Sequence, residues 1–480
     1  MEMSTPRPHF LLLAFPLQGY IAPALRLAKR LLAAAPDALV TFSTNATAHS
    51  RMFSGGEEAN TDGGDGRLEF LPFSDEEVAA KPGRGAAAVD AAACSAYMAS
   101  FHAAGARGAG ALMDALRARG RPVTRVVYTL MLPWAARVAR ARGVPSALYW
   151  PQPAAVFAAY HHYFLGGYAG VVDAHRHDPS FVVRMPGLPP QRLGDLPSFI
   201  TESTDPSHVF HGVFATLRDH FDVLGREEEE ATTVLVNTCR ELEAGALAAV
   251  GAAHNKNSLV PVGPVLASDD EAGLFEVDGS KYVEWLNTKP ARSVVYVAIG
   301  SFVLMAWQQV AELVRGLEDT GRPYLLVVRK DNKQATDADD HGVLDLLKNG
   351  IVVEWCDQVR VLAHAAVGCF VTHCGWNSVM ESVASGVPVV GMPHFSDQRT
   401  NARLVERQWR VGIRAVVDGS GLVRAAELGR CIQEVMGDGE DAAKVRRNAR
   451  EWKRVVREAT AKGGSSDSSL MEFVQAAGTC

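Results

Sequence analysis

The sequence predicts an α/β protein built from two doubly wound, parallel-sheet domains, and three observations lead to this prediction. The length of 480 residues exceeds what one ordinary core supports. Short apolar segments alternate with helical patterns in two successive series, which is typical of parallel sheets covered on both faces. The composition, with 48% hydrophobic and 21% charged residues, is that of a globular protein.

The first series fills the N-terminal half of the chain. Its expected strands cover residues 9–15, 38–43, 68–72, 125–128, 146–150 and 234–237. Helical patterns cover residues 21–35, 103–118 and 132–142, and Pro23 falls near the first turn of the first one, where proline is tolerated. Residues 47–66, 76–85 and 186–197 lack periodicity and are expected to form surface loops.

The second series follows a polar stretch. Its expected strands cover residues 293–298, 324–328, 350–354 and 368–372, and its expected helices cover 307–320 and 377–384. A charged helical pattern follows residue 442, and an apolar helix is expected at 470–477. These patterns predict an N-terminal domain at 1–250, a linker at 251–280, a C-terminal domain at 281–455 and a final helical segment at 456–480.

Charge and cysteine content exclude several classes of function. The 48 basic and 54 acidic residues give a net charge of −6, which does not favour nucleic acid as a partner. The seven cysteines are scattered without a C-x-x-C pair, so we expect reduced thiols rather than a zinc site or disulfide framework. No segment has the roughly 18–20 apolar residues needed to cross a bilayer. We therefore expect a soluble, cytoplasmic monomer without membrane insertion.

Residues 355–398 place polar groups where a strand ends and a helix begins. The expected strand 368–372 ends at His373, and a Cys-Gly turn leads into the helix. Free N–H groups and the positive end of the helix dipole favour a diphosphate, and His373, Asn377 and Ser378 add donors there. Since Ser378 and Glu381 have S-x-x-E spacing, the alternative is that they only cap the helix.

The two ends of this segment predict contacts to a base and a sugar. Trp355 follows the expected strand 350–354, where an indole can stack on uracil, or can be a core residue. Asp397 and Gln398 can divide the hydroxyls of a hexose between them, or can be a solvated loop pair. We interpret the whole as a site for a nucleotide diphosphate sugar. No metal is expected, because the segment has no D-x-D pair of carboxylates.

The same segment, WCDQVRVLAHAAVGCFVTHCGWNSVMESVASGVPVVGMPHFSDQ, resembles the signature box of plant family 1 UDP-glycosyltransferases. VNTCRELE, PVGP, WLNTKPARSVVYV and PGLPPQRLGDLPSF resemble other family segments, so the likeness covers nearly the whole chain. YTLMLPWAARVARARGVPSALYW resembles the subgroup that glucosylates anthocyanins at the 5-O position, flavonoids, crocetin and hormone acids. The resemblance implies the GT-B fold, with two facing Rossmann-like domains and a C-terminal helix crossing back to the first.

The resemblance also implies which residues bind the donor. Those at uracil and ribose would be Trp355, Cys356 through its backbone, Gln358 and Glu381. Those at the diphosphate would be His373, Asn377, Ser378 and Ser301, and those at the sugar would be Trp376, Asp397 and Gln398. A closing glutamine goes with glucose more often than with galactose in this family. The implied reaction needs no cofactor and uses UDP-glucose as co-substrate, transferring glucose with inversion to a phenol or carboxylate of a small hydrophobic acceptor.

The chain departs from the family at the catalytic positions. The family base is the histidine of P-x-Q-G-H, and this sequence has Tyr20 at that place. The family aspartate that orients the base is replaced by Thr129, but threonine is usual at this place in the subgroup that the chain resembles, so Tyr20 is the real departure. A phenol with an ordinary pKa of about 10 is a poor proton acceptor at neutral pH. We therefore expect transfer to be altered at the step that activates the acceptor.

Three explanations of Tyr20 stay open. The acceptor can arrive already ionised, as a carboxylic acid with a pKa of about 4 does. His161 or His162 can serve as the base, although both can also be residues of a helix surface. Third, the chain can be a UDP-sugar-binding protein with impaired or no transfer activity. A NAD-type oxidoreductase is a further rival class, but residues 15–23 lack the G-x-G-x-x-G that it requires.

Overall fold

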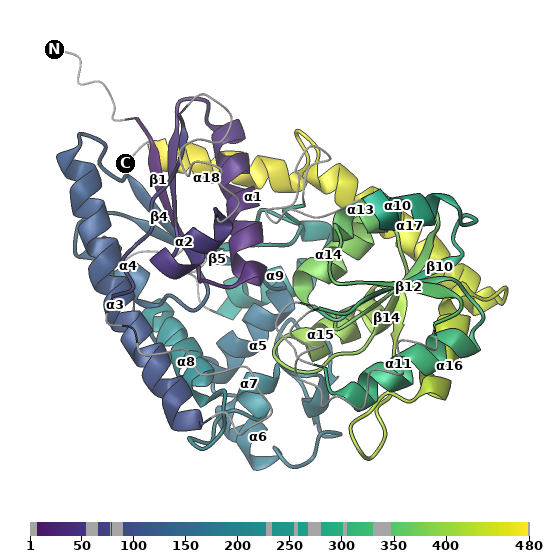
Figure 1. Cartoon of the computed structure of the whole chain (residues 1–480). Helices are drawn as coiled ribbons and strands as arrows, with labels where there is room; N and C mark the ends of the chain where they lie inside the picture. Colours follow the sequence, from purple (N-terminus) through teal and green to yellow (C-terminus); the bar gives the residue numbers. More distant parts are fainter. Residues whose placement is uncertain are drawn as a thin grey trace. The chain divides into compact units, whose positions relative to one another are not determined.

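The computed structural model describes residues 7–53, 66–76, 78, 90–226, 233–253, 258–266, 280–300, 305–329 and 347–478. These residues form two units, shown in Figure 1. The first unit contains the described residues up to 266 together with those from 459 onward, and the second contains those from 280 to 458. The chain therefore returns to its first unit after completing the second.

The first unit is built on a seven-stranded parallel sheet in the order β3-β2-β1-β4-β5-β8-β9. The strands are β1 (His9–Leu13), β2 (Leu39–Ser43), β3 (Leu68–Phe70), β4 (Arg125–Thr129), β5 (Ser146–Trp150), β8 (Thr233–Val236) and β9 (Ser258–Pro261). A separate antiparallel pair joins β6 (Val182–Val183) and β7 (Gln191–Arg192). The buried, apolar strands explain why sequence patterns located this sheet.

Helices cover this sheet, and the last one comes from the C-terminus. They are α1 (Gln18–Ala34), α2 (Ala46–Met52), α3 (Ala91–Ala118), α4 (Trp134–Arg140), α5 (Ala154–Phe164), α6 (Ala169–Ala174), the 3₁₀ turn η1 (Leu193–Asp195), α7 (Ser198–Thr201), α8 (His211–Arg226), α9 (Arg240–Ala253) and α18 (Ser465–Gly478). In Figure 1, α18 lies beside α1. Leu470 and Phe473 of α18 enter the same core cluster as the apolar face of α1. The C-terminal helix is thus part of the core of the first unit.

The second unit has a six-stranded parallel sheet in the order β12-β11-β10-β13-β14-β15. The strands are β10 (Val294–Ala298), β11 (Tyr324–Val327), β12 (Gly350–Val353), β13 (Val367–Thr372), β14 (Val389–Gly391) and β15 (Gly412–Arg414). The helices are α10 (Ser280–Asn287), α11 (Trp307–Asp319), α13 (Gln358–Ala363), α14 (Trp376–Ser385), α15 (Gln398–Arg403), the π-helical turn η3 (Leu404–Gln408), α16 (Ala425–Met436) and α17 (Glu440–Thr460). Both sheets have the doubly wound strand order of Rossmann-like domains, which confirms the predicted fold class.

Alternation along β10 shows how the second sheet is covered. Val295 and Val297 pack in the cluster that contains the apolar faces of α11 and α16. Val294 and Tyr296 pack in the other cluster, with residues of α10 and α13. Because successive strand residues point to opposite faces, the helices form a layer on each side of the sheet.

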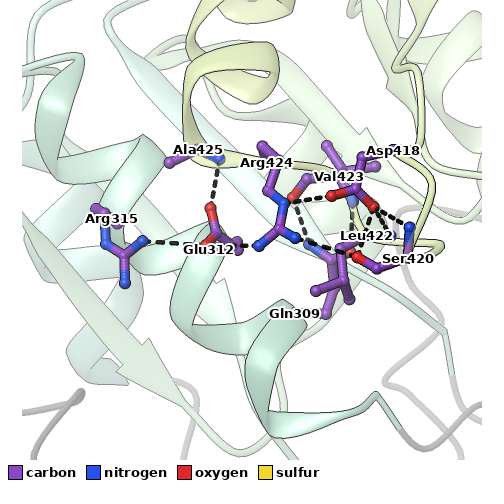
Figure 2. A network of polar contacts seen from close by, with 9 residues as sticks. All are labelled: Gln309, Glu312, Arg315, Asp418, Ser420, Leu422, Val423, Arg424 and Ala425. Atoms are coloured by element: carbon purple, nitrogen blue, oxygen red, sulfur yellow. Dashed lines mark hydrogen bonds and ion pairs between the residues drawn. The ribbon is translucent and has the colours of Figure 1, made fainter.

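A polar network fixes the segment between β15 and α16 against α11 (Figure 2). The Gln309 side chain donates to the carbonyl of Val423 at 2.9 Å and accepts its N–H at 2.8 Å. Glu312 accepts the N–H of Ala425, the first residue of α16, at 2.8 Å. Arg424, which precedes that helix, pairs with both Glu312 and Asp418. A glutamate of one helix thus supplies the N-terminal cap of another.

Four sequence expectations about local structure were wrong or incomplete. Residues 46–52, expected within a loop, form α2, because the side chain of Asn45 accepts the N–H of Ala48 and caps the helix. The helix expected at 103–118 begins at Ala91, where Asp90 caps an alanine-rich stretch of high helix propensity. Residues 191–195, expected within a surface loop, form β7 and η1. Residues 258–261, expected within the linker, form edge strand β9 of the first sheet.

No helix in the described part of the chain combines the length and the apolar character that crossing a bilayer requires.

Candidate functional site

The candidate donor site lies at the carboxyl edge of the second sheet. Its predicted residues follow the ends of β12, β13 and β14, and these strands are parallel, so the segments after them meet at one edge. The site is described here from its base-binding end to its sugar-binding end. Ser301, predicted for the diphosphate, lies outside the described residues.

The predicted base-binding end is formed by the loop between β12 and α13. Trp355 in this loop is partly exposed and does not belong to the buried core, so the alternative of a core tryptophan is wrong. Cys356 is buried, and its Sγ lies 3.3 Å from the hydroxyl of Tyr296. Burial raises the pKa of Cys356 to about 12, so this thiol is neutral. The partly exposed side chain of Trp355 is therefore accessible to a base that stacks on it.

Three residues predicted for the donor are joined to one another. Gln358 Nε2 donates to Glu381 Oε2 at 2.7 Å and to Ser378 Oγ at 3.1 Å. The hydroxyl of Tyr296 donates to Gln358 Oε1 at 3.3 Å, which fixes the orientation of the amide. Tyr296, on β10, thus helps to hold these three side chains in place, and sequence reasoning missed it. These bonds hold the Glu381 carboxylate at the position predicted for ribose.

The capping-box alternative for Ser378 and Glu381 is wrong. The N-cap of α14 is Gly375, which has no side chain to cap the helix. Ser378 is therefore the third residue of the helix, and Glu381 lies one turn further on. The positive end of the dipole of α14 thus lies beside His373, where it favours an anion.

His373 is held between two glycines at the start of this helix. A Cβ on Gly300 would lie 2.5 Å from its Nε2, and a Cβ on Gly375 would lie equally close at 2.5 Å. Both positions therefore require glycine for the imidazole to fit, and Gly300 also has a φ of +80°. Burial, with a smaller contribution from His394, lowers the pKa of His373 to about 4. The ring is neutral at pH 7 and can donate one N–H to a phosphate.

The predicted sugar-binding end is buried, so the alternative of a solvated loop pair is wrong. Asp397 and Gln398 are 7% and 5% exposed. Gln398 Oε1 accepts the backbone N–H groups of His394 at 2.9 Å and Phe395 at 3.2 Å. In this orientation the amide presents Nε2, with its two hydrogens, as the donor of the pair. An acceptor-only carboxylate and an amide donor thus stand side by side.

Trp376 is placed differently from the other predicted sugar contacts. Its side chain is buried and packs against the ring of Trp409 with the centroids 5.9 Å apart. The indole is therefore part of the packing under α14. If Trp376 contacts the donor, its backbone N–H in the first turn of that helix is the group in position to do so.

Tyr20 and Thr129 belong to the first unit, at the carboxyl edge of its sheet. Tyr20 is partly exposed in the first turn of α1, and its ring meets that of Phe15 edge to face, with centroids 5.4 Å apart. Thr129 is fully buried, and its Oγ1 accepts the N–H of Phe15 at 2.9 Å. The threonine hydroxyl therefore fixes the segment after β1. A Cβ on the adjacent Gly19 would meet no atom within 4 Å, so space is open beside Tyr20.

The two histidines considered as substitute bases are buried, and the alternative of a helix surface is also wrong. His161 is 0% and His162 is 2% exposed on α5. The Nε2 of His162 lies 2.9 Å from the carbonyl of Pro186, which it contacts as a donor. Neither ring reaches the surface, so neither can take a proton from a bound acceptor in this conformation.

Comparison with known proteins identifies the family. A model of the family described as UDP-glucoronosyl and UDP-glucosyl transferase matches residues 275–440. Crocetin glucosyltransferase, chloroplastic, from Gardenia jasminoides is 41% identical, with 98% of this chain and 97% of the relative covered. Anthocyanidin 3-O-glucoside 5-O-glucosyltransferase 1 from Perilla frutescens is 39% identical, with 98% of each chain covered.

Solved structures agree with these relatives. The crystal structure of Os79 from O. sativa in complex with UDP has a TM-score of 0.80 at 30% identity, covering 98% of this chain and 100% of that one. A UDP-glucosyltransferase from Polygonum tinctorium has a TM-score of 0.81 at 26% identity, covering 99% of each. The chain therefore belongs to the plant UDP-glycosyltransferases of the GT-B fold, as its motifs predicted. It is a glycosyltransferase whose donor is a UDP-sugar.

Proposed function

We propose that this chain transfers glucose from UDP-glucose, with inversion, to a small hydrophobic acceptor whose oxygen is already ionised or strongly acidic. An aromatic or hormone-like carboxylic acid fits best, and an acidic phenol such as a flavonoid or anthocyanin hydroxyl comes next. We further propose that it acts as a cytoplasmic monomer. The relatives named for crocetin and anthocyanidin glucosides support this range of acceptors.

Tyr20 is the observation on which the acceptor class depends. A phenol with an ordinary pKa of about 10 is a poor proton acceptor at neutral pH, and the hydroxyl of the nearby Thr129 is neutral and accepts the N–H of Phe15. A carboxylate acceptor has no proton to lose at pH 7 and does not need a base. Its oxygen attacks the anomeric carbon, the bond from that carbon to the β-phosphate oxygen breaks, and UDP leaves with the electron pair.

The leaving group would be stabilised within the second unit. The negative charge that develops on UDP would be met by the positive end of the dipole of α14 and by the neutral imidazole of His373. Asp397 and Gln398 would orient the glucose hydroxyls. None of these contributions depends on Tyr20, so the donor half can work normally with an acceptor that activates itself.

A matched pair of acceptors tests the proposal. With UDP-glucose at neutral pH, 4-ethylbenzoic acid should form its glucose ester faster than 4-ethylphenol forms its glucoside. Tyr20→His should raise the phenol rate by roughly 10²-fold, at the lower end of general-base effects because Thr129 cannot orient the new ring. The same variant should change the rate with the acid little.

The outcomes separate the proposal from its rival. Wild-type protein that glucosylates 4-ethylphenol as fast as the Tyr20→His variant would refute the role assigned to ionised acceptors. If wild type binds UDP-glucose but glucosylates nothing in a broad acceptor panel, and Tyr20→His restores transfer, the chain is a UDP-sugar-binding protein. Tyr20 is the observation that favours this second candidate.

A further inference from the structure

Asn401 connects the predicted sugar-binding end of segment 355–398 to the turn that precedes α14. It lies on α15 and is 0% exposed. Its Nδ2 donates to Asp397 Oδ2 at 2.7 Å and to the carbonyl of Cys374 at 2.8 Å. Asp397 is a predicted sugar contact, and Cys374 immediately precedes the start of the helix predicted to hold the diphosphate. One amide nitrogen therefore connects both parts of the site.

The chemistry at this position requires an amide nitrogen. The two partners, a carboxylate and a carbonyl, can only accept hydrogen bonds, and Nδ2 carries two hydrogens to donate. The opposite orientation would place Oδ1 against two acceptors, so the assignment of the amide is secure. Aspartate here would add a second buried negative charge, and a hydroxyl would supply a single donor.

This arrangement leaves one polar atom without a partner. Within the described residues, Asn401 Oδ1 is buried and accepts no hydrogen bond. A buried acceptor of this kind costs about 1–3 kcal/mol. A residue selected for stability alone would not keep an orphaned oxygen in the core. Its retention points to a role in holding its two partners.

Both partners sit next to strained backbone. Cys374 has a φ of 62°, and Ser396, immediately before Asp397, has a φ of 61°. Non-glycine residues adopt this left-handed conformation rarely and at a cost of about 1–3 kcal/mol. Such turns persist when surrounding contacts fix them. Asn401 contacts the carbonyl of Cys374 and the side chain of Asp397, which follows Ser396.

We infer that Asn401 is a positioning residue for the donor sugar: it holds the Asp397 carboxylate in its binding geometry and ties it to the Cys374 turn. This inference rests on the proposed role of Asp397 at the sugar of UDP-glucose. Asn401 itself touches no substrate, since it is fully buried beneath both groups.

The bond also affects the charge of Asp397. Burial raises the pKa of Asp397, and the hydrogen bonds from Asn401 and Ser396 oppose that rise. The titratable neighbour is the Cys374 thiol, whose pKa burial raises to about 12 while Arg414 acts in the opposite direction, so it stays neutral. Without Asn401, Asp397 should take up a proton at a higher pH and lose its value as an acceptor for sugar hydroxyls.

Binding of UDP-glucose relative to UDP, measured by calorimetry, tests this without requiring transfer. Asn401→Leu should lower the ratio of the two affinities by about 5- to 30-fold, the loss expected when one charge-assisted hydrogen bond is removed. The remaining ratio should fall further as the pH is lowered, and this fall should begin at a higher pH in Asn401→Leu than in wild type. Asn448→Leu is the matched control, because it removes an amide-to-carbonyl bond on α17, to Arg410, away from the site.

A double substitution shows whether Asn401 acts through Asp397. In the Asp397→Ala background, Asn401→Leu should change the affinity ratio by less than about 2-fold, because the group it positions is gone. Unchanged affinity for UDP reports that the variant is folded, and Asn401→Ser replaces Asn401→Leu if it is not. An equal loss in both backgrounds, or a ratio for Asn401→Leu equal to that of Asn448→Leu, overturns the inference.

Failure of the proposed function gives a different pattern. If wild type binds UDP-glucose no more tightly than UDP, the proposed donor is wrong and the inference falls with it. If wild type prefers UDP-glucose and Asp397→Ala keeps that preference, the role of Asp397 is wrong although the donor is right.

Discussion

The oxygen and the nitrogen of the Gln398 side-chain amide have different roles, and a substitution can test the two roles separately. Its Oε1 holds the loop by accepting the N–H groups of His394 and Phe395. Its Nε2 is the donor that we propose for the sugar. Gln398→Glu keeps an oxygen at the first position and replaces the donor by a second acceptor. The loop should therefore keep its conformation while the sugar loses one hydrogen bond.

The expected loss follows from this one bond. A hydrogen bond contributes about 1–1.5 kcal/mol net, so the ratio of UDP-glucose to UDP affinity should fall about 5- to 15-fold at pH 8. The new carboxylate is buried beside Asp397, and both burial and the like charge should raise its pKa. As the pH falls toward 5.5 it should become protonated and regain an O–H donor, so that the ratio partly recovers.

Calorimetric titrations at pH 8 and pH 5.5 measure both effects. Taking the ratio to UDP cancels repulsion between the added charge and the diphosphate, which both ligands experience. Gln433→Glu, an exposed glutamine on α16, controls for the charge itself and should behave as wild type. A Gln398→Glu variant that keeps the wild-type ratio at pH 8, or one whose loss does not diminish at pH 5.5, would refute the assignment of Nε2 to the sugar.

Two further predictions concern the first unit. Glu243 is buried, and its two carboxylate oxygens accept the first two N–H groups of α5 at 3.0 and 2.9 Å. Glu243→Gln should reduce the local stability of this helix end by about 1–2 kcal/mol. Hydrogen exchange should then be about 5- to 30-fold faster at that end of α5 and unchanged elsewhere. Burial lowers the pKa of His220 to about 3. Its contribution to stability is therefore complete above pH 6.5 and is lost as the pH falls below that value. At pH 5 the free energy of unfolding should be lower by about 2 kcal/mol. The melting temperature should therefore fall more between pH 7 and pH 5 in wild type than in His220→Phe, whereas a change at the exposed His177 should leave this dependence intact.

The two sheets, and the sheet edge with the candidate donor site, could be predicted because the apolar sequence pattern and the topology of a parallel sheet agree there. Buried strands of a parallel sheet are continuous apolar runs, and residues after their ends must gather at one edge. This logic placed Trp355, His373 and Asp397 near one another without any knowledge of contacts. It could not decide between binding and capping for Ser378, since the first residue of α14 lies within the usual uncertainty of helix ends.

Burial was the property that single-sequence reasoning assigned least well. His161 and His162 follow an aromatic, alanine-rich stretch whose weak polarity pattern leaves no preferred outer face, and both are buried. Asn401 was missed although a signal existed, because its spacing of four from Asp397 places both on one face of a helix. That spacing becomes informative only once Asp397 is known to be buried and α15 is known to begin at Gln398.

Tyr20 and Thr129 are connected through Phe15. Position 129 is fully buried, and a carboxylate there without a histidine partner would be a desolvated, unpaired charge. A threonine hydroxyl avoids that cost and has a structural role, since it accepts the N–H of Phe15, whose ring contacts that of Tyr20. Tyr20 is the residue that bears on catalysis, because a phenol with an ordinary pKa of about 10 is a poor base at neutral pH. An acceptor that brings its own negative charge needs no base, so this well-packed edge is compatible with transfer to a carboxylate.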